Sequence, residues 1–376
     1  MVTDAQQAPD ADEPTPLGPL RRVTIDNFMV FERFDESFSP GLNVIIGTNG
    51  TGKSVFLRTA YAMLYAIWKE WRNQPEGWTR SSLLFLIYYA NCLCIEKSEP
   101  DFFDLRKEVS RNILFSAVFN IAETVIEFNP EELLNLSKEI DTTTHVLPTI
   151  PLLIPSHELI SSASTVVGLA RKYKDAGFSK VDVDLATAVL VPELREENIA
   201  LPLRDLREKL ARTIGGTPRK GSGERFVLSQ GAGSSDLLMV LVAEGHRKLA
   251  QLVQLIQNGS LTPGMTLFWD EPETNLNPAL QRLMAVTLVD LVGAGVQVFV
   301  ATHSFFLMKE ISLEILRRKL DSDTAEEVPC RYFSFSLEDG KVAVERGDSL
   351  EDLQTITALD AAIDQEDRAQ ELYSRL

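Results

Sequence analysis

The amino-acid sequence predicts an α/β fold: a mixed sheet core with an antiparallel β subdomain and an α-helical lobe. Residues 47–54 read G-T-N-G-T-G-K-S, directly after the apolar run 42–46 and before a long helical pattern. A strand, a glycine-rich loop and a helix in this order form a phosphate-binding loop. Residues 244–301 alternate between helix and strand patterns, which favours a parallel sheet covered on both faces. Partly alternating apolar runs in residues 20–38 and 111–128 indicate further short strands.

The remaining elements follow from apolar periodicity and turn residues. In the N-terminal half we expect strands at 20–31, 34–38 and 42–46, helices at 54–71, 78–97, 130–140 and 156–171, two strands within 111–128 and one within 142–154. Residues 185–212 predict one or two helices. In the C-terminal half we expect a hairpin at 226–242, a helix from 244 to Asn258-Gly259, strands at 265–269 and 296–301 around a helix at 278–292, a hairpin at 331–345 and one or two helices within 350–376.

We expect one domain with short extensions. Residues 1–19 are acidic and Pro-rich and predict a disordered tail. Residues 20–348 form a single head, in which 20–72 and 225–348 build the core and 73–224 an inserted helical lobe. Residues 349–376 are C-terminal helices.

The composition restricts the partners and the compartment. The net charge of −17 disfavours broad non-specific DNA binding, so the charge does not indicate DNA as a partner, although a local basic patch would still allow it to bind. The three cysteines, Cys92, Cys94 and Cys330, form no CxxC pair and indicate neither a disulfide framework nor a zinc site. Residues 1–19 lack the basic and apolar regions of a signal peptide, and the longest apolar run, 83–94, is too short to span a bilayer. We therefore expect a cytoplasmic protein without a membrane partner.

The loop at residues 47–54 is the predicted ATP site. Its backbone N–H groups can point at phosphate oxygens, and the N-terminus of the next helix favours an anion. Lys53 is expected to reach the β- and γ-phosphates, and the Ser54 hydroxyl to hold Mg²⁺. The predicted ATP-binding residues of the loop are Gly47, Thr48, Asn49, Gly50, Thr51, Gly52, Lys53 and Ser54.

Polar residues follow two apolar strand patterns further along the chain. Asp270 ends the run T-L-F-W-D and is the expected Mg²⁺ ligand. Glu271 comes next and can accept a proton from the attacking water as general base. His303 follows the run V-F-V-A-T, 33 residues after Asp270. We interpret it as a second catalytic residue that hydrogen-bonds the γ-phosphate.

The motifs G-x-N-G-x-G-K-S, D-E-P-E-T-N-L-N-P and A-T-H-S, in this order, resemble those of ABC-type ATPase heads. They are similar in particular to the SMC, RecF and OLD-like branch of AAA-family ATPases, which includes stand-alone bacterial proteins. Asn277 stands where that branch often has His. The resemblance covers roughly residues 20–70 and 225–335. It implies two heads that enclose two ATP molecules, with the loop of one head facing a signature segment of the other and residues 273–278 crossing the interface.

Two segments are candidates for the signature segment that faces ATP on the other head. Residues 228–231 read L-S-Q-G, but they lie in an expected hairpin, 41 residues before Asp270 at Ser229. Residues 243–248 read A-E-G-H-R-K, open a helix and resemble the S-[DE]-G-x-[RK] signature. We therefore expect Glu244 and Gly245 to contact ATP bound to the second head through a helix N-terminus. Ala243 replaces the usual serine, so one hydroxyl contact to the γ-phosphate is lost.

A second departure concerns the Gln loop of these ATPases. No glutamine occurs between Gln74 and Gln230, so the usual Mg²⁺- and water-contacting Gln is absent or replaced. Residues 153–159 read L-I-P-S-H-E-L and resemble an I-P-x-[KR]-[DE]-[ML]-L segment of small bacterial ATPases. The alternative interpretation is an ordinary strand-to-helix turn.

The resemblance implies an ATP-hydrolysing head that dimerises around MgATP and regulates or drives a separate effector. Stand-alone heads of this kind often occur in anti-phage or toxin–antitoxin-like operons. The alternatives are a DNA-repair or chromosome-maintenance ATPase of RecF or SMC kind, a transporter subunit, and an ATP-sensing module with little turnover. The acidic charge and the lack of a long coiled coil disfavour the DNA-repair or chromosome-maintenance ATPase. The missing Gln disfavours the transporter subunit, and the retained Glu271 disfavours the ATP-sensing module.

Overall fold

The computed structural model of the chain describes residues 15–16, 20–73, 114–119, 125–128, 146–147, 149–173, 177–231, 235–321, 327–338 and 340–374. Four sheets are present in these residues. The predicted helices at 78–97 and 130–140 lie outside the described residues, as do Cys92 and Cys94 and most of the predicted acidic tail. Within that tail, β1 (Thr15–Pro16) pairs in parallel with β7 (Val146–Leu147).

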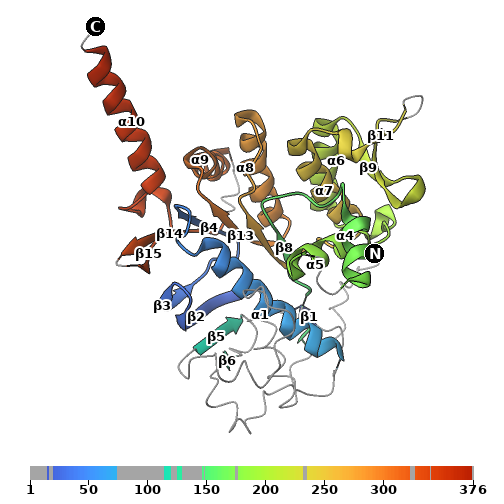
Figure 1. The fold of residues 1–376 in the computed structure, drawn as a ribbon, viewed down its shortest axis with the longest axis horizontal. Coiled ribbons are helices and arrows are strands. Elements are labelled where there is room, and N and C mark those ends of the chain that lie inside the picture. Colours follow the sequence, from blue (N-terminus) through green and yellow to red (C-terminus); the bar gives the residue numbers. More distant parts are fainter. Residues whose placement is uncertain are drawn as a thin grey trace, which may run out of the picture.

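A six-stranded mixed sheet forms the centre of the molecule (Figure 1). Five strands are parallel, and an antiparallel hairpin partner, β15, closes one edge. In spatial order the strands are β15 (Lys341–Gly347), β14 (Cys330–Glu338), β4 (Leu42–Gly47), β13 (Gln297–Thr302), β12 (Thr266–Asp270) and β8 (Leu152–Ile154). This mixed α/β architecture confirms the predicted fold class.

The two faces of this sheet pack into different apolar clusters because successive side chains of a strand point to opposite faces. On β12, Leu267 and Trp269 lie in one cluster and Phe268 in the other. On β4, Val44 and Ile45 divide in the same way. All five of these side chains are at most 1% exposed. The predominantly apolar sequences of these strands thus result from burial on both faces.

One face of the central sheet is covered by α1 (Lys53–Asn73). Beyond α1 lies an antiparallel sheet in the order β3 (Phe31–Ser37), β2 (Leu20–Phe28), β5 (Leu114–Phe119) and β6 (Val125–Phe128). In Figure 1 the helix runs between the two sheets. Phe56 of α1 contacts the rings of Phe34 and Phe299 at centroid distances of 5.0 and 6.3 Å. These rings join β3, α1 and β13 in one layer.

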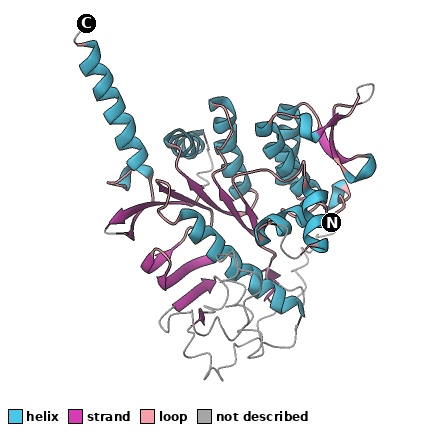
Figure 2. Ribbon diagram, in the orientation of Figure 1, coloured by secondary structure: helices cyan, strands magenta, loops and turns pink. Residues whose placement is uncertain are grey.

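Helices and a small sheet cover the other face (Figure 2). α8 starts where Asn277 accepts a hydrogen bond from Leu280 N at 2.9 Å and Pro278 occupies the first turn, which is a strong N-terminal signal. The helices are α4 (Ala163–Lys172), α5 (Lys180–Val189), α6 (Leu201–Ile214), α7 (Glu244–Gln257), α8 (Pro278–Gly293) and α9 (Phe305–Asp321). The three-stranded sheet contains β9 (Thr217–Lys220), β10 (Phe226–Ser229) and β11 (Leu237–Leu238). Short 3₁₀ turns are η2 (Glu196–Asn198), η3 (Ser222–Glu224) and η4 (Met239–Leu241).

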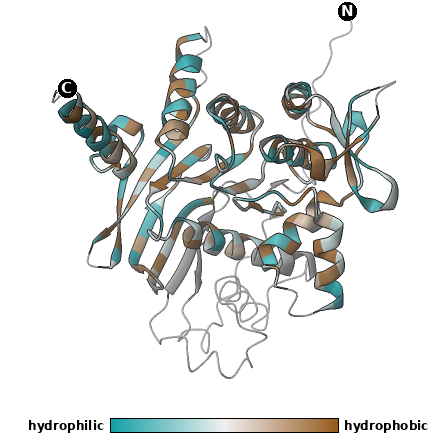
Figure 3. Ribbon diagram, turned by 45° about the horizontal axis from the view of Figure 1, so that its top comes forward, coloured by the Kyte–Doolittle hydropathy of each residue, from teal (hydrophilic) through white to brown (hydrophobic). Residues whose placement is uncertain are grey.

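The chain ends in η5 (Leu350–Asp352) and α10 (Thr357–Tyr373). α10 has no buried residue and projects from the body, with the C-terminus at its tip (Figure 1). In Figure 3 brown, apolar stretches occur in both the strands and the helices of the body, and α10, which ends at the C mark, is mixed in colour. None of the helices in the described ranges combines the length and hydrophobicity that crossing a membrane would require.

The structure matches most of the expected elements, but α9 and β9 were not expected, and other expected elements differ in their bounds or in the sheet they join. α4 begins at Ala163, seven residues later than the pattern at 156–171 indicates, because residues 156–162 form turns. The region 142–154 contains two short strands, β7 and β8, in different sheets. β8 is the edge strand of the central sheet, and β5 and β6 extend the antiparallel sheet. The inserted range 73–224 thus supplies strands to both.

The stacked pair Phe268 and Phe299, at 5.0 Å between ring centroids, predicts a strong stability effect. Phe268→Ala should lower the free energy of unfolding by about 3–5 kcal/mol, because it leaves a cavity between β12 and α1. Denaturant unfolding measures the change. Phe306→Ala, at a residue 41% exposed on α9, is the matched control and should change stability by less than about 0.5 kcal/mol. Equal effects of the two variants would contradict the assigned core.

Candidate active site

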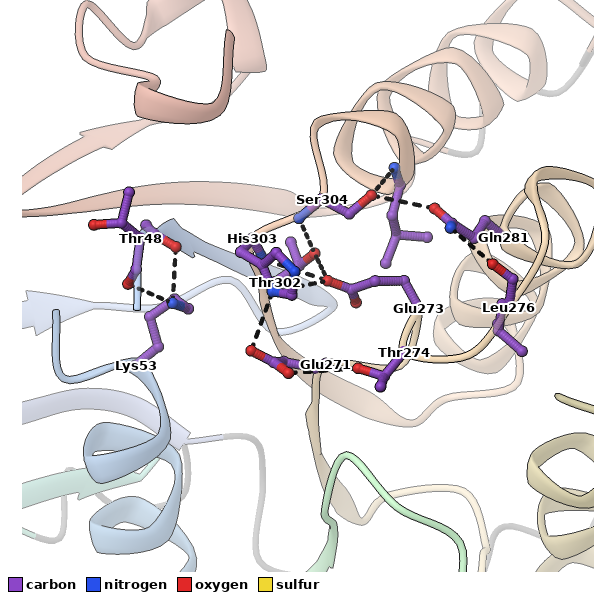
Figure 4. Close-up of polar contacts among 12 residues, drawn as sticks. Thr48, Lys53, Glu271, Glu273, Thr274, Leu276, Gln281, Thr302, His303 and Ser304 are labelled. Atoms are coloured by element: carbon purple, nitrogen blue, oxygen red, sulfur yellow. Dashed lines mark hydrogen bonds and ion pairs between the residues drawn. The ribbon is translucent and has the colours of Figure 1, made fainter. Parts of the chain in front are cut away.

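The predicted site residues meet at one edge of the central sheet because three parallel strands end there. Ile46 of β4 pairs with Thr302 of β13, and Asp270 of β12 pairs with Ala301. The loop after β4, the Asp270-Glu271 pair and His303 therefore start at the same level. The carboxyl ends of parallel strands are the usual ligand sites of open α/β sheets. Figure 4 shows Lys53 on one side of this edge and Glu271, Glu273 and His303 on the other.

The loop at residues 47–54 has a shape that only glycine permits at two positions. Gly52 has φ +88°, and a Cβ atom there would lie 2.7 Å from Val30 Cγ2. A Cβ atom at Gly47 would lie 2.5 Å from the carbonyl oxygen of Phe335. Thr51 fixes the turn through a hydrogen bond from its hydroxyl to Thr48 O at 2.8 Å. The loop is thus already wrapped around the N-terminus of α1.

Lys53 points back into this loop. Its ammonium group donates to the carbonyl oxygens of Gly47 and Thr48, each at 2.8 Å, and the residue is only 5% exposed. Burial lowers the pKa of Lys53, and the nearby carboxylates of Glu271 and Asp270 counteract this effect in part. The lysine is therefore a buried cation held by two weak acceptors, which phosphate oxygens can replace with stronger charge-assisted bonds.

Asp270 fits an Mg²⁺ ion. Burial raises the pKa of its carboxyl group, and a hydrogen bond from Ser54 acts in the opposite direction. Its Oδ1 atom is buried and has no hydrogen-bond partner among the described residues. A buried orphaned carboxylate oxygen beside a serine hydroxyl gives the oxygen donors that Mg²⁺ prefers when phosphates and water complete its shell. No cluster of three or more acidic, His or Cys ligands occurs in the described residues, so the ion would rely on the nucleotide.

Glu271 lies in an uncommon backbone conformation. Its φ is +46°, a left-handed value that costs about 1–3 kcal/mol for a residue with a side chain. Its N–H donates to Ala301 O at 2.8 Å, which ties the residue to β13. Its Oε1 lies 3.1 Å from His303 Nδ1, and Thr274 Oγ1 donates to Oε2 at 3.4 Å. With a side chain 26% exposed, the carboxylate can meet a water molecule.

Glu273 is a buried residue whose role the sequence does not reveal. It is 4% exposed, and burial raises the pKa of its carboxyl group. Its Oε1 accepts hydrogen bonds from Thr302 Oγ1 at 2.6 Å and from His303 N at 3.3 Å. The carboxylate thus fixes the backbone from which the His303 ring projects. The only sequence signal is its place as the second Glu of D-E-P-E.

A series of hydrogen bonds extends from Thr302 to Gln281 of α8, and the sequence does not indicate it. Ser304 N donates to Thr302 Oγ1 at 3.0 Å, and Ser304 Oγ donates to Gln281 Oε1 at 3.1 Å. Gln281 Nε2 donates to Leu276 O at 3.0 Å (Figure 4). These hydrogen bonds connect the turn that carries His303 with the segment that follows Glu273.

The structure does not bring Glu244 and Gly245 to the loop of the same chain. α7 begins at Glu244, as expected, and Ala243 is its N-cap without a side-chain bond. Glu244 Oε1 accepts from Asn275 Nδ2 at 2.8 Å, and a Cβ at Gly245 would lie 2.9 Å from Leu276 Cδ2. None of the described contacts of these two residues reaches residues 47–54. Their contact with ATP on a second head remains a prediction.

Residues 153–159, which resemble the I-P-x-[KR]-[DE]-[ML]-L segment, begin in β8. Because Ile154 pairs with Trp269, residues 155–158 leave the sheet beside Asp270. His157 Nε2 lies 3.1 Å from Asp182 Oδ1, and this contact raises the pKa of His157. Glu158 pairs with Arg247 of α7 at 2.7 Å. The segment thus connects β8 with α5 and α7, and it has no glutamine.

Two family models match the sequence in separate stretches. One, described as "AAA domain, putative AbiEii toxin, Type IV TA system", matches residues 203–309. The other, described as an AAA domain, matches residues 22–140. Both models describe AAA domains, so the chain is similar to AAA proteins over these two stretches. The first stretch contains α7, the Asp270-Glu271 pair and His303, and the second contains the glycine-rich loop at residues 47–54. The predicted resemblance is therefore confirmed.

Three solved structures of SMC heads are similar to this chain at low sequence identity. The "SMC head domain from Thermotoga maritima" is 13% identical, with a TM-score of 0.44, covering 88% of this chain and 99% of that one. An SmcHead bound to the C-winged helix domain of ScpA is 16% identical, with a TM-score of 0.45 and coverages of 89% and 98%. An Smc head domain with an extended coiled coil, bound to the C-terminal domain of ScpA derived from Pyrococcus furiosus, is 14% identical, with a TM-score of 0.42 and coverages of 93% and 99%. A search of curated protein sequences found no match.

Lys53→Ala should weaken ATP binding at least about 100-fold, because the charge-assisted bonds to phosphate are lost. Fluorescent-nucleotide titration or calorimetry measures the affinity. Lys319→Ala, at an exposed lysine of α9, is the matched control and should bind like the wild type. Unchanged affinity of the Lys53 variant would contradict the site.

Asp270→Asn should stabilise the nucleotide-free protein. Because burial raises the pKa of Asp270, the folded state keeps its proton to higher pH than the unfolded chain does. Stability is then greatest below the pKa that Asp270 has in the unfolded chain and falls as the pH rises towards its pKa in the folded protein. At pH 7 the ionised carboxylate therefore lowers the stability of the fold. We expect the variant to melt about 1–3 °C higher at pH 7 and to lose Mg²⁺-dependent stabilisation by ATP. The exposed Asp205→Asn is the control, and a lower Tm of the Asp270 variant would refute the prediction.

Proposed function

We propose that the chain binds MgATP at residues 47–54 and Asp270 and hydrolyses it with Glu271 as general base. The observation that supports this most directly is the Glu271–His303–Glu273 cluster at the same sheet edge as Lys53. A carboxylate accessible to water, oriented by a histidine that is itself fixed by a buried carboxylate, is an arrangement suited to activating water. Ordinary surface carboxylates lack such support.

The chemistry follows from the positions of these groups. Lys53 exchanges the carbonyls of Gly47 and Thr48 for phosphate oxygens, and Ser54 and Asp270 would hold Mg²⁺. The ion, when bound with ATP, neutralises charge on the phosphates. Glu271 accepts a proton from water as the water oxygen bonds to the γ-phosphorus and the bond to the bridging oxygen of ADP breaks. The products are ADP and phosphate.

His303 acts between Glu271 and the γ-phosphate. Its Nδ1 faces Glu271 Oε1 at 3.1 Å, so that Nδ1 is the donor of that contact. Its Nε2 has no partner among the described residues. With Nδ1 protonated, Nε2 donates to a phosphate oxygen only as the imidazolium. The ring thus orients the base first and contacts the γ-phosphate when it carries both protons.

The proposed active form is a homodimer around ATP. Glu244 and Gly245 of one copy would then face the γ-phosphate bound by the other, through the N-terminus of α7. Ala243 contributes no hydroxyl there, so backbone N–H groups would make the contact. Such a bridge differs between the ATP-bound and empty states, which is the condition for a nucleotide switch.

We further propose that the switch regulates a separate effector, with anti-phage defence as the setting. This proposal draws on the toxin–antitoxin description of the family model that matches residues 203–309. The runner-up is a DNA-repair or chromosome-maintenance ATPase, which requires DNA-stimulated turnover from a protein with a net charge of −17. An ATP sensor with little turnover is the third candidate.

Glu271→Gln should keep ATP affinity and reduce turnover about 100-fold or more, because Gln cannot accept the proton. It should also accumulate an ATP-bound dimer. Phosphate release, measured with and without DNA, and size-exclusion chromatography with light scattering test this. The exposed Glu338→Gln on β14 is the matched control.

Each alternative has its own outcome in this experiment. Wild-type turnover by the Glu271 variant would refute the general base. An elution profile that ignores ATP would refute the dimer. ATP binding without hydrolysis by the wild type would favour the sensor, and strong stimulation by DNA would favour the repair ATPase.

A further inference from the structure

Lys248, in the second turn of α7, is a buried charge that the proposed chemistry does not use. The residue is 2% exposed, and an ammonium group in such a position requires acceptors. Its Nζ donates to Thr274 O at 2.7 Å and lies 3.5 Å from Glu271 O. Burial lowers the pKa of Lys248 to about 8, opposed by the charges of Glu273, Glu244, Glu271 and Glu158. The side chain is therefore mainly protonated at pH 7.

The acceptors of Lys248 belong to a segment that needs support from outside. Residues 271–276 contain two non-glycine residues with positive φ, Glu271 at +46° and Asn275 at +63°. Within the segment, Thr274 N donates to Glu271 O at 3.1 Å and Leu276 N to Glu273 O at 2.9 Å. A left-handed backbone persists only where its surroundings fix it. The Lys248 ammonium group donates to the carbonyl oxygens of Glu271 and Thr274, the first and last residues of the first turn of this segment.

The first turn of α7 contacts the same segment. Asn275 Nδ2 donates to Glu244 Oε1 at 2.8 Å, and Leu276 packs so closely on Gly245 that a Cβ atom would lie 2.9 Å away. The two turns of α7 and residues 271–276 are thus joined by a hydrogen bond, an apolar contact and the buried ammonium group. A displacement of the α7 N-terminus would be transmitted to the backbone of Glu271.

We infer that Lys248 is a positioning residue: it holds the carbonyls of Glu271 and Thr274 and so links the N-terminus of α7 to the base of the same head. The inference rests on the proposed function. If the α7 N-terminus contacts ATP held by a second copy, Lys248 makes the orientation of Glu271 in one site depend on occupancy of the other. Hydrolysis at the two sites would then be cooperative.

The test compares Lys248→Met, which keeps the length and removes the donor, with Lys248→Gln, which keeps a neutral donor. We expect the Met variant to lose about 10–100-fold in kcat with KM for ATP changed less than about threefold, since only the orientation of the base is altered. The Gln variant should recover part of the loss. Lys209→Met, which removes an α6 lysine paired with Asp290 at 2.9 Å, is the control and should turn over like the wild type.

A second readout does not depend on turnover. Hydrogen exchange of the backbone amides of residues 272–277 in the nucleotide-free protein should accelerate about tenfold in the Met variant, because a charged hydrogen bond to the segment is lost. Wild-type kcat and wild-type exchange in both variants would overturn the inference. Loss of ATP affinity or of folding in both variants would also overturn it, because Lys248 would then be needed for the fold and not for positioning Glu271. If the wild type does not hydrolyse ATP, the proposed function fails while the exchange measurement still decides whether Lys248 holds the segment.

Discussion

Two buried ionisable side chains, Lys53 and Glu273, and the partly buried Asp270 lie at one sheet edge without full compensation, and the arrangement of the site depends on them. Burial lowers the pKa of Lys53 and raises those of Asp270 and Glu273, because the protein stabilises the charged form of each group less than water does. Oδ1 of Asp270 and Oε2 of Glu273 have no hydrogen-bond partner among the described residues. A fold tolerates such groups where a ligand supplies the missing interactions. ATP with Mg²⁺ has the charges that this edge needs.

The rest of the fold keeps these groups in place. The parallel register of β4, β13 and β12 brings residues 47, 270 and 303 to one level although they are far apart in sequence. The aromatic layer around Phe56 fixes α1, and hence Lys53, against that edge. On the opposite face, α7 is joined to the segment after Glu271 and, through Arg247 and Glu158, to the segment after β8. The helical layer is thus connected by hydrogen bonds and an ion pair to the two segments beside Asp270 and Glu271.

The parts of the fold that the sequence predicts are those with strong local patterns. The strands at 42–46, 265–269 and 296–301 are apolar runs buried on both faces, and α8 has an Asn cap followed by Pro. α9 is not evident, because charges occur throughout it and only Leu307, Met308, Ile311 and Glu314 are buried. The bond between Thr302 and Glu273 and that between Lys248 and Thr274 were also unpredictable. They join residues 29 and 26 positions apart, and their partners are set by strand register and helix packing.

The left-handed backbone of Glu271 has a consequence for how this position can change over time. Asn and Gly adopt such a φ with less strain than Glu does, so either would relieve the backbone there. Natural selection for a stable fold alone would therefore favour replacing the glutamate. Under the proposed function, in which Glu271 is the general base, a related chain that no longer hydrolyses ATP is expected to tolerate Asn or Gly at this position better than this chain does.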